Sequence, residues 1–220
     1  MTSLASLTLE VADLAAAERF YAASGLGAHV SLRASEAPTD GFRGFTVSLT
    51  VAQPADVRGL VDAAVDAGAT VLKPASKSFW GYGGVVRAPD GTIWKVASSE
   101  KKDTGPATGR VDRIVLLLGT SDITESKQFY VGRGLAVAKS FGRKYVEFAA
   151  PEGAVTLALY GRKALAKDAG VPVDGTGSHR LVLRGESGGS GVSGESLDGG
   201  SFTDPDGFAW EAAAPVAHAS

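Results

Sequence analysis

The chain has 220 residues, enough for two domains of about 100 residues with a core each. Its 22 basic and 24 acidic residues give a net charge of -2, and lysine and arginine form no cluster suited to phosphates, so we expect no nucleic-acid partner. The absence of cysteine excludes disulfides, thiolate metal ligands and a cysteine nucleophile.

The sequence begins MTSLASLTLEV, without the basic segment that is typical of a signal peptide. It also contains no apolar run long enough to cross a membrane as a helix. We therefore expect a cytoplasmic protein with no membrane partner.

The first half opens with a strand at 7–11 and a helix that Asp13 caps and Gly25 ends. A second strand, 45–51, leads to a helix over 54–68 that begins with a proline. We expect this second helix to bury one apolar face, formed by Val57, Leu60, Val61, Ala64 and Val65.

A hairpin closes the first half, because the Pro-Asp-Gly triplet at 89–91 supplies a turn between two extended runs. The same triplet recurs at 205–207. Trp94 and Trp210 alternate with their neighbours in the strands that follow, and we expect both indoles to pack in the core.

The second half has a helix capped by Asp122, then strands at 144–149, 155–160 and 179–184. Residues 185–200 follow, and they are too rich in Gly and Ser to bury an apolar face. We interpret this segment as a flexible loop or as a mobile lid over a pocket, and we expect weak amide-exchange protection there.

Two motifs recur in the same order, which indicates an internal duplication. DLAAAERFY at 13–21, with Gly-Leu after it, returns as DITESKQFY at 122–130. GGVVRAPDGTIWK at 83–95 returns as GGSFTDPDGFAWE at 199–211. The expected organisation is a domain at 1–99, a Pro- and Gly-containing linker at 100–109, a second domain at 110–215 and a tail at 216–220.

The repeated pattern of strand, Asp-capped helix ending in Phe-Tyr and Gly-Leu, and strands closing on a D-P-D-G-x-x-W-E hairpin resembles the vicinal-oxygen-chelate superfamily. Its members include glyoxalase I, bleomycin-resistance proteins, fosfomycin-modifying enzymes and extradiol dioxygenases. The resemblance implies an α+β fold of tandem glyoxalase-like domains, each a pair of βαβββ modules that curl a sheet around a ligand cavity. Two of the four modules are reduced here, since the first lacks a strand and the fourth lacks its helix. Such a fold does not fix the reaction.

The resemblance also provides a test for a metal. Metal-dependent members place His, Gln or Glu in the first strand of each module and Glu in its last strand. In the first half these positions hold Ser6, Thr46 and Lys95, and a protonated lysine has no lone pair for a cation. The resemblance therefore implies no catalytic metal in the first half.

In the second half two such positions survive, because Glu211 follows Trp210 and His179 opens a strand. The remaining positions hold Arg113 or Val115, and Ala158 or Tyr160. We expect no metal or other cofactor, with a divalent metal held by the second half as the alternative. Protein dialysed against cobalt, nickel, zinc and manganese is expected to retain well below one ion per chain.

Aromatic side chains could stack on a planar ligand, or they could simply pack against the protein. They are Phe79, Trp80 and Tyr82 in the first half and Phe141, Tyr145 and Tyr160 in the second.

We expect the protein to enclose a small organic ligand without a metal and without turnover. The candidate ligand-binding residues are Arg113, His179, Glu211, Tyr145, Tyr160, Phe79, Trp80, Tyr82 and Lys95. One alternative is an enzyme, either a metal-assisted lyase or isomerase using His179 and Glu211 or a metal-free acid/base catalyst using Glu211. The other is an interaction module, for example a homodimer, whose cavities are filled by side chains.

Strand parity points Glu211 into the cavity of the second half, where a carboxylate needs a cation. Arg113 occupies a vacant ligand position, and its planar fork suits a carboxylate. The sequence thus predicts an Arg113–Glu211 ion pair with His179 nearby, in place of a metal.

Overall fold

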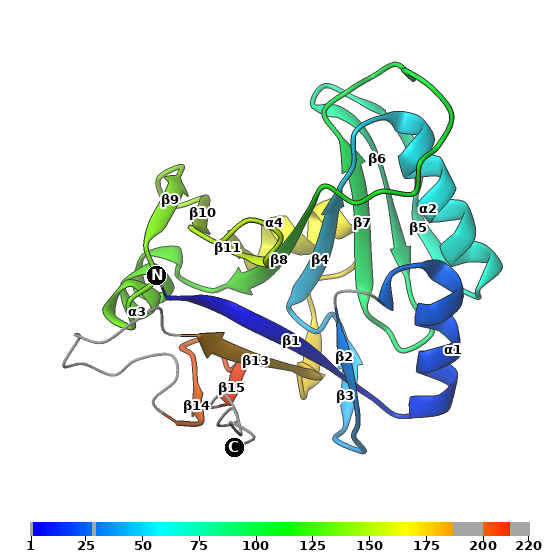
Figure 1. The fold of residues 1–220 in the computed structure, drawn as a ribbon. Helices are drawn as coiled ribbons and strands as arrows, with labels where there is room; N and C mark the ends of the chain where they lie inside the picture. The colour runs from blue at the N-terminus through cyan, green and yellow to red at the C-terminus, as the bar shows by residue number, and fades with distance from the viewer. Residues whose placement is uncertain (1, 28–29, 187–199, 212–220) are drawn as a thin grey trace, which may run out of the picture.

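The computed structural model describes residues 2–27, 30–186 and 200–211. These residues form an α+β fold with an eight-stranded sheet, a five-stranded sheet, a two-stranded sheet and four helices (Figure 1). Within these described ranges, no helix is long and apolar enough to span a membrane. Most of the Gly-rich segment at 185–200 lies outside the described residues, as does the tail, so the expectations for them stay predictions.

The eight-stranded sheet joins two strand-helix-strand units edge to edge. Its strands in spatial order are β5 (Thr70–Ser78), β6 (Gly81–Arg87), β7 (Ile93–Ser98), β4 (Phe45–Thr50), β8 (Arg113–Thr120), β11 (Thr156–Gly161), β10 (Tyr145–Phe148) and β9 (Val137–Ser140). β4 is parallel to β7, and β8 is parallel to β11, whereas β4 and β8 pair antiparallel.

The five-stranded sheet pairs the beginning of the chain with its end. Its spatial order is β14 (Phe202–Thr203), β15 (Ala209–Glu211), β13 (Leu181–Glu186), β1 (Ser3–Val11) and β2 (Ser31–Ala34). A short sheet of β12 (Gly175–Gly177) and β3 (Thr39–Gly41) lies beside it. Both large sheets therefore contain strands from both copies of the repeat, and neither copy forms a sheet alone. The domain boundaries drawn from the repeat stay a prediction.

The helices begin where the sequence predicts them. Asp13 accepts a hydrogen bond from Ala16 N at the start of α1 (Leu14–Ser24), and Gly25 ends the helix with a φ of 72°. α2 (Pro54–Asp66) begins with its proline, and Asp122 caps α3 (Ile123–Gly132). Val65 is an exception to the predicted burial on α2, because it is 38% exposed whereas Val57 is fully buried.

The linker is held against α2 by two buried side chains. Gln53 Oε1 accepts hydrogen bonds from the backbone N–H groups of Thr104 and Gly105. Asp56 is fully buried and accepts from Thr108 and Gly109. Burial alone would raise the pKa of Asp56, but these hydrogen bonds hold it below its ordinary value. The linker is therefore a packed part of the structure.

A fourth helix, α4 (Arg162–Ala169), was not predicted. It ends at Gly170, whose φ is 79°, and it buries Leu165, Ala166 and Ala169 against one face of the eight-stranded sheet. The opposite face of that sheet belongs to the main core, which also includes Trp94 and Trp210, at 0% and 1% exposure. The prediction that both indoles are core residues is confirmed.

Candidate functional site

The residues that face α4 follow from the register of the eight-stranded sheet. Ser48 on β4 pairs with Lys95 on β7 and with Val115 on β8, so the three lie in one row across the sheet. Arg113 and Leu117 share this face by strand alternation. We call this side the α4 face. Three positions that the sequence singled out, Lys95, Arg113 and Val115, therefore lie on this face.

α4 covers one end of the α4 face. Asp168 on this helix forms an ion pair with Lys95, with 2.6 Å between Nζ and Oδ2. Lys73 donates hydrogen bonds to the carbonyl oxygens of Lys167 and Asp168, at 2.8 and 2.6 Å. A position at which a metal ligand is expected thus holds a cation that is already paired within the chain.

The described residues do not fit a divalent metal. In the ranges that the structure covers, no three His, Asp or Glu side chains cluster as metal ligands. On the α4 face the row of Ser48, Lys95 and Val115 offers an ammonium group and no carboxylate or imidazole. We derive no chemistry through a metal.

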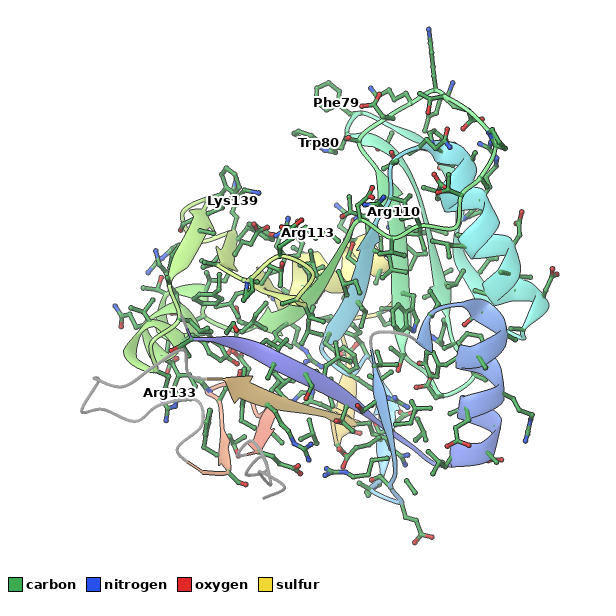
Figure 2. The ribbon with its side chains drawn as sticks, viewed as in Figure 1. Phe79, Trp80, Arg110, Arg113, Arg133 and Lys139 are labelled. Atoms are coloured by element: carbon green, nitrogen blue, oxygen red, sulfur yellow. The ribbon has the colours of Figure 1, made fainter. Side chains whose placement is uncertain are left out.

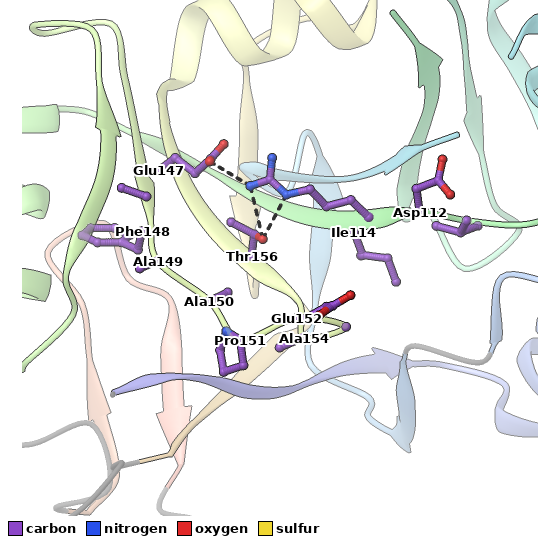
Figure 3. A pocket seen from close by; sticks show the side chains of 14 residues that line it. Asp112, Ile114, Glu147, Phe148, Ala149, Ala150, Pro151, Glu152, Ala154 and Thr156 are labelled. Atoms are coloured by element: carbon purple, nitrogen blue, oxygen red, sulfur yellow. Dashed lines mark hydrogen bonds and ion pairs between the residues drawn. The ribbon is translucent and has the colours of Figure 1, made fainter. Parts of the chain in front are cut away.

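A cavity of about 480 Å³ lies beyond the end of the α4 face that α4 leaves open (Figure 3). It is bounded by the ends of β8, β10 and β11 and by the connection at 149–155. Its lining is mainly apolar, with Val111, Ile114, Ala138, Phe148, Ala149, Ala150, Pro151 and Ala154. Asp112, Arg113, Glu147, Glu152 and Thr156 add polar groups. This size and this mixture are typical of small-molecule sites.

Arg113 is held in place at the wall of this cavity. Its Nη2 lies 2.8 Å from Glu147 Oε1, and its Nε and Nη2 donate to Thr156 Oγ1 at 3.3 Å. Figure 3 shows these contacts as dashed lines. Its Nη1 has no hydrogen-bond partner among the residues that the structure describes. The guanidinium is therefore fixed, with one donor nitrogen left for a ligand.

Glu147 is the anchor of that arrangement. Its side chain is only 7% exposed, and it accepts from Tyr145 at 2.7 Å and from Lys139 at 3.2 Å as well as from Arg113. Burial would raise the pKa of Glu147, but the three donors outweigh it and hold the pKa below its ordinary value. Burial, together with the adjacent carboxylate, raises the pKa of the Tyr145 hydroxyl. Tyr145 is therefore a neutral donor.

A second cavity, of about 310 Å³, lies between the β5–β6 hairpin and α4. Trp80, Tyr82 and Lys95 all line it, together with Asp168. Phe79 contacts Trp80 edge to face, and the two rings are 81% and 83% exposed at the hairpin tip (Figure 2). The structure thus brings three of the proposed ligand-binding residues to one cavity, with Phe79 beside it.

Tyr145 and Tyr160 form a pair on the α4 face, with ring centroids 6.2 Å apart, and Phe141 lies 6.1 Å from Tyr145. Tyr160 also packs against the cluster that α4 buries. These rings lie near Arg113 in the sheet but do not line the 480 Å³ cavity.

The predicted Arg113–Glu211 ion pair is wrong. Arg113 lies in the eight-stranded sheet, whereas Glu211 lies on β15 of the five-stranded sheet. Glu211 instead pairs with Arg33 at 2.6 Å and with Arg184 at 3.0 Å. These hydrogen bonds, that from Arg33 above all, hold the pKa of Glu211 below its ordinary value. Glu211 is thus paired with two arginines, but these lie on β2 and β13, and the pairing of those strands was not predicted from the sequence.

His179 precedes β13 and does not open that strand as predicted. Its Nδ1 lies 2.5 Å from Arg43 O, its Nε2 lies 3.2 Å from Asp206 O, and its ring stacks on Phe208 with centroids 4.1 Å apart. The groups that contact His179 are not those that contact Glu211, so the two do not form the catalytic pair of the enzyme hypothesis.

Three residues that shape these sites were missed from the sequence: Arg33, Glu147 and Asp168. Asp168 could not be assigned without α4. Glu147 alternates with two apolar neighbours in a short strand, and this isolated acid in an apolar strand was the available signal. Arg33 pairs in register with Glu10, a neighbour that only the β1–β2 pairing creates.

The sequence matches no family profile and no curated protein. The structure, however, is similar to that of a glyoxalase I variant from Zea mays, with 14% identity, a TM-score of 0.60 and coverage of 96% of this chain and 92% of that one. The chain has the fold of glyoxalase I. The unmodified Zea mays glyoxalase I aligns at 12% identity with a TM-score of 0.57 and coverage of 96% and 91%.

The glyoxalase I fold extends to a proposed dioxygenase from Bacillus subtilis, at 11% identity and a TM-score of 0.52, over 83% of this chain and 69% of that one. The fold inferred from the repeated motifs, that of the vicinal-oxygen-chelate proteins, is thus confirmed. At these identities the similarity concerns the fold alone, and the chemistry must be argued from this chain's own residues.

Proposed function

We propose that this glyoxalase-fold protein binds a small organic molecule in the 480 Å³ cavity at Arg113, without a metal and without turnover. The observation that carries the proposal is the fixed guanidinium of Arg113, which lines a mainly apolar cavity and whose Nη1 has no partner among the described residues. A ligand with an apolar body and one acceptor group matches this arrangement.

The contacts of Glu147 argue for binding over catalysis. A general base needs a lone pair free for a substrate proton and a pKa near the working pH. Glu147 already accepts from three donors, and its pKa is lowered. The side chains that were proposed for catalysis, His179 and Glu211, are likewise engaged elsewhere. The described residues thus favour a site that orients a ligand.

The proposal is tested with a screen of small aromatic and aliphatic carboxylates and ketones by ligand-observed NMR. Hits are titrated against the unmodified protein and the Ala150→Phe variant, which fills the cavity from its loop. We expect at least tenfold weaker binding to Ala150→Phe. Arg58→Gln is the control, because Arg58 pairs with Asp103 on the surface and neither residue lines the cavity.

Trp80 fluorescence distinguishes the two cavities. Trp80 lines the 310 Å³ cavity and is exposed, whereas Trp94 and Trp210 are buried. A ligand at Arg113 is expected to leave the emission of Trp80 unchanged. If every hit quenches Trp80 and binds Ala150→Phe normally, the site is the second cavity and the proposal for Arg113 is wrong.

A second candidate function, interaction with another protein chain, is favoured by Phe79 and Trp80. Two large apolar side chains exposed above 80% at one hairpin tip are uncommon on a protein without a partner. A homodimer is the simplest form of this candidate. Sedimentation of the unmodified protein and of a Phe79→Ser, Trp80→Ser double variant tests it. If the hairpin tip forms the interface, the unmodified protein should sediment as a dimer and the variant as a monomer.

A further inference from the structure

A separate cavity, of about 220 Å³, lies between α1 and the turn that joins β6 and β7. It is far in the topology from Arg113 and is lined by Thr39, Arg43, Asp90 and Arg180, with Tyr21 and Phe20 of α1. None of the hypotheses above assigns it a role. Its polar residues include two arginines, whereas the cavity at Arg113 has one.

Two buried polar atoms at this cavity have no hydrogen-bond partner. They are Thr39 Oγ1 and Arg43 Nη1. A buried donor without a partner costs about 1–3 kcal/mol, more when it is charged. The other donor of the Arg43 guanidinium is used, because Nη2 donates to Asp90 O at 2.5 Å. Both atoms without a partner therefore belong to residues that line this cavity.

A second guanidinium borders the same space. Arg180 is 8% exposed and donates to the carbonyl oxygens of Ala37 and Ser35, at 2.6 to 3.0 Å. Its φ of 52° is the one positive value among the non-glycine residues that the structure describes. Such a backbone conformation is uncommon for arginine, and strained residues of this kind cluster at functional sites.

The carboxylates at this cavity are already engaged. Asp90 accepts from Tyr21, and from the side chain and backbone of Thr92. Asp13 accepts from the N-terminus of α1. Burial first, and then the neighbouring Arg180, lower the pKa of Arg43, while Asp90 opposes them. The cavity is thus bordered by two arginines and by the two residues whose buried polar atoms have no partner, and its two acids accept hydrogen bonds from other donors.

We propose that this cavity binds a small oxyanion, a carboxylate or a phosphate group, through Thr39 Oγ1 and Arg43 Nη1, with Arg180 as the second positive charge. A guanidinium and a hydroxyl are common donors to such groups. The size of the cavity suits a small anion or the anionic end of a larger molecule. This site is independent of the proposed function at Arg113.

The test is isothermal titration of the full chain with sodium phosphate and, separately, sodium acetate, at constant ionic strength set with chloride. Saturable binding of phosphate alone identifies the ligand group as phosphate, and saturable binding of acetate identifies a carboxylate. Both results support the site. If neither anion binds up to about 20 mM, a range that still detects millimolar dissociation constants, water fills the cavity and the proposal is wrong.

Variants locate the binding. Thr39→Val removes the hydroxyl at nearly constant volume. Because a hydrogen bond to a charged group contributes roughly tenfold or more in affinity, we expect this variant to bind the anion at least about tenfold more weakly. Thr39→Ser restores the hydroxyl and is expected to restore binding. Thr120→Val is the matched control, since Thr120 Oγ1 is also buried without a partner but lies away from this cavity.

The charge contribution is tested by Arg43→Gln, with Arg58→Gln as the control for net charge, because Arg58 pairs with Asp103 on the surface. Binding that is unchanged in both Thr39→Val and Arg43→Gln contradicts the proposal. If Arg43→Gln does not fold, the Thr39 pair of variants decides the question alone, with circular dichroism confirming that each is folded.

Discussion

Lys95 on β7 and Asp168 on α4 form an ion pair of 2.6 Å across the α4 face of the eight-stranded sheet. The pair joins the end of the first half of the chain to a helix of the second half. It also places a cation in a position where the superfamily resemblance implies a metal-ligand carboxylate. The same ion pair therefore holds α4 on the sheet and occupies Lys95, which cannot act as a metal ligand while it is protonated.

The first prediction concerns the strength of this pair. The side chains of Lys95 and Asp168 are 33% and 41% exposed, so solvent screens their attraction. A double-mutant cycle of Lys95→Met and Asp168→Asn, measured by urea unfolding, is expected to give a coupling of about 0.2–1 kcal/mol. Lys77→Met on the β5–β6 hairpin serves as the control. A coupling of several kcal/mol would show that the pair is desolvated in solution.

The second prediction concerns Glu147. We expect Glu147→Gln to lower the free energy of unfolding at neutral pH by roughly 1–3 kcal/mol, because donors from three residues lose a charged acceptor. Glu152→Gln is the control, since Glu152 also lines the cavity but is exposed.

Glu147 also gives a pH dependence with a definite sign. Its pKa is lower in the folded protein, so its contribution is complete above the unfolded pKa of about 4.3 and is lost as the pH falls through the folded pKa. The difference in unfolding free energy between the unmodified protein and Glu147→Gln should therefore shrink in acid. A difference that grows below pH 4 would contradict the lowered pKa.

The third prediction separates the observed partners of Glu211 from the one that the sequence suggested. Arg33 bridges Glu10 and Glu211, with 2.6 Å to each carboxylate. A cycle of Arg33→Gln and Glu211→Gln is expected to give a coupling of about 0.5–1 kcal/mol in unfolding experiments. The cycle of Arg113→Gln and Glu211→Gln should be additive within about 0.5 kcal/mol, because the two residues share no partner.

The fourth prediction uses the two copies of the Phe-Tyr motif as mutual controls. Trp210 Nε1 donates to the hydroxyl of Tyr130, which in turn donates to Asp204. In the first copy Tyr21 donates to Asp90, and Trp94 Nε1 lies near the Tyr21 hydroxyl but makes no hydrogen bond of normal geometry. Tyr130→Phe removes the partner of the Trp210 indole N–H and of Asp204 Oδ2, although Asp204 Oδ1 keeps its two backbone donors. Tyr21→Phe removes no hydrogen bond from an indole.

We therefore expect Tyr130→Phe to lower the free energy of unfolding by roughly 2–4 kcal/mol, as measured by chemical denaturation. The loss for Tyr21→Phe should be smaller than this by about 1 kcal/mol or more. Both tyrosines are buried, at 0% and 2% exposure, so differences in hydration do not explain the contrast. Equal costs would mean that the indole bond adds nothing to the stability.

Local structure could be predicted from the sequence wherever it depends on residues that are close along the chain. Asp13 and Asp122 marked the two capped helices, and the Pro-Asp-Gly triplets marked the hairpins of β6 with β7 and β14 with β15. α4 was missed although Leu165, Ala166 and Ala169 share a face and Gly170 ends it, because the helix is short and otherwise charged.

The site could be predicted only in part, because it depends on strand pairing between distant segments. Lys95, Arg113 and Tyr160 were each proposed from their own half of the chain, and the sheet brings them to a common face. Strand alternation could not reveal that Glu211 lies in the other sheet. That outcome rests on the pairing of β13 with β1 and β15, which no local pattern encodes.

The pairing of β1 with β13 also constrains how the chain can fold as it is synthesised. β1 is made well before β13, because the two strands that pair lie at Ser3–Val11 and Leu181–Glu186. The unit from β4 to β7 finds its partners within a short stretch, so it can assemble early. Until β13 emerges, β1 can pair only with β2, and its other edge stays unpaired. A nascent chain stalled before β13 is therefore the form of this protein that a chaperone would bind.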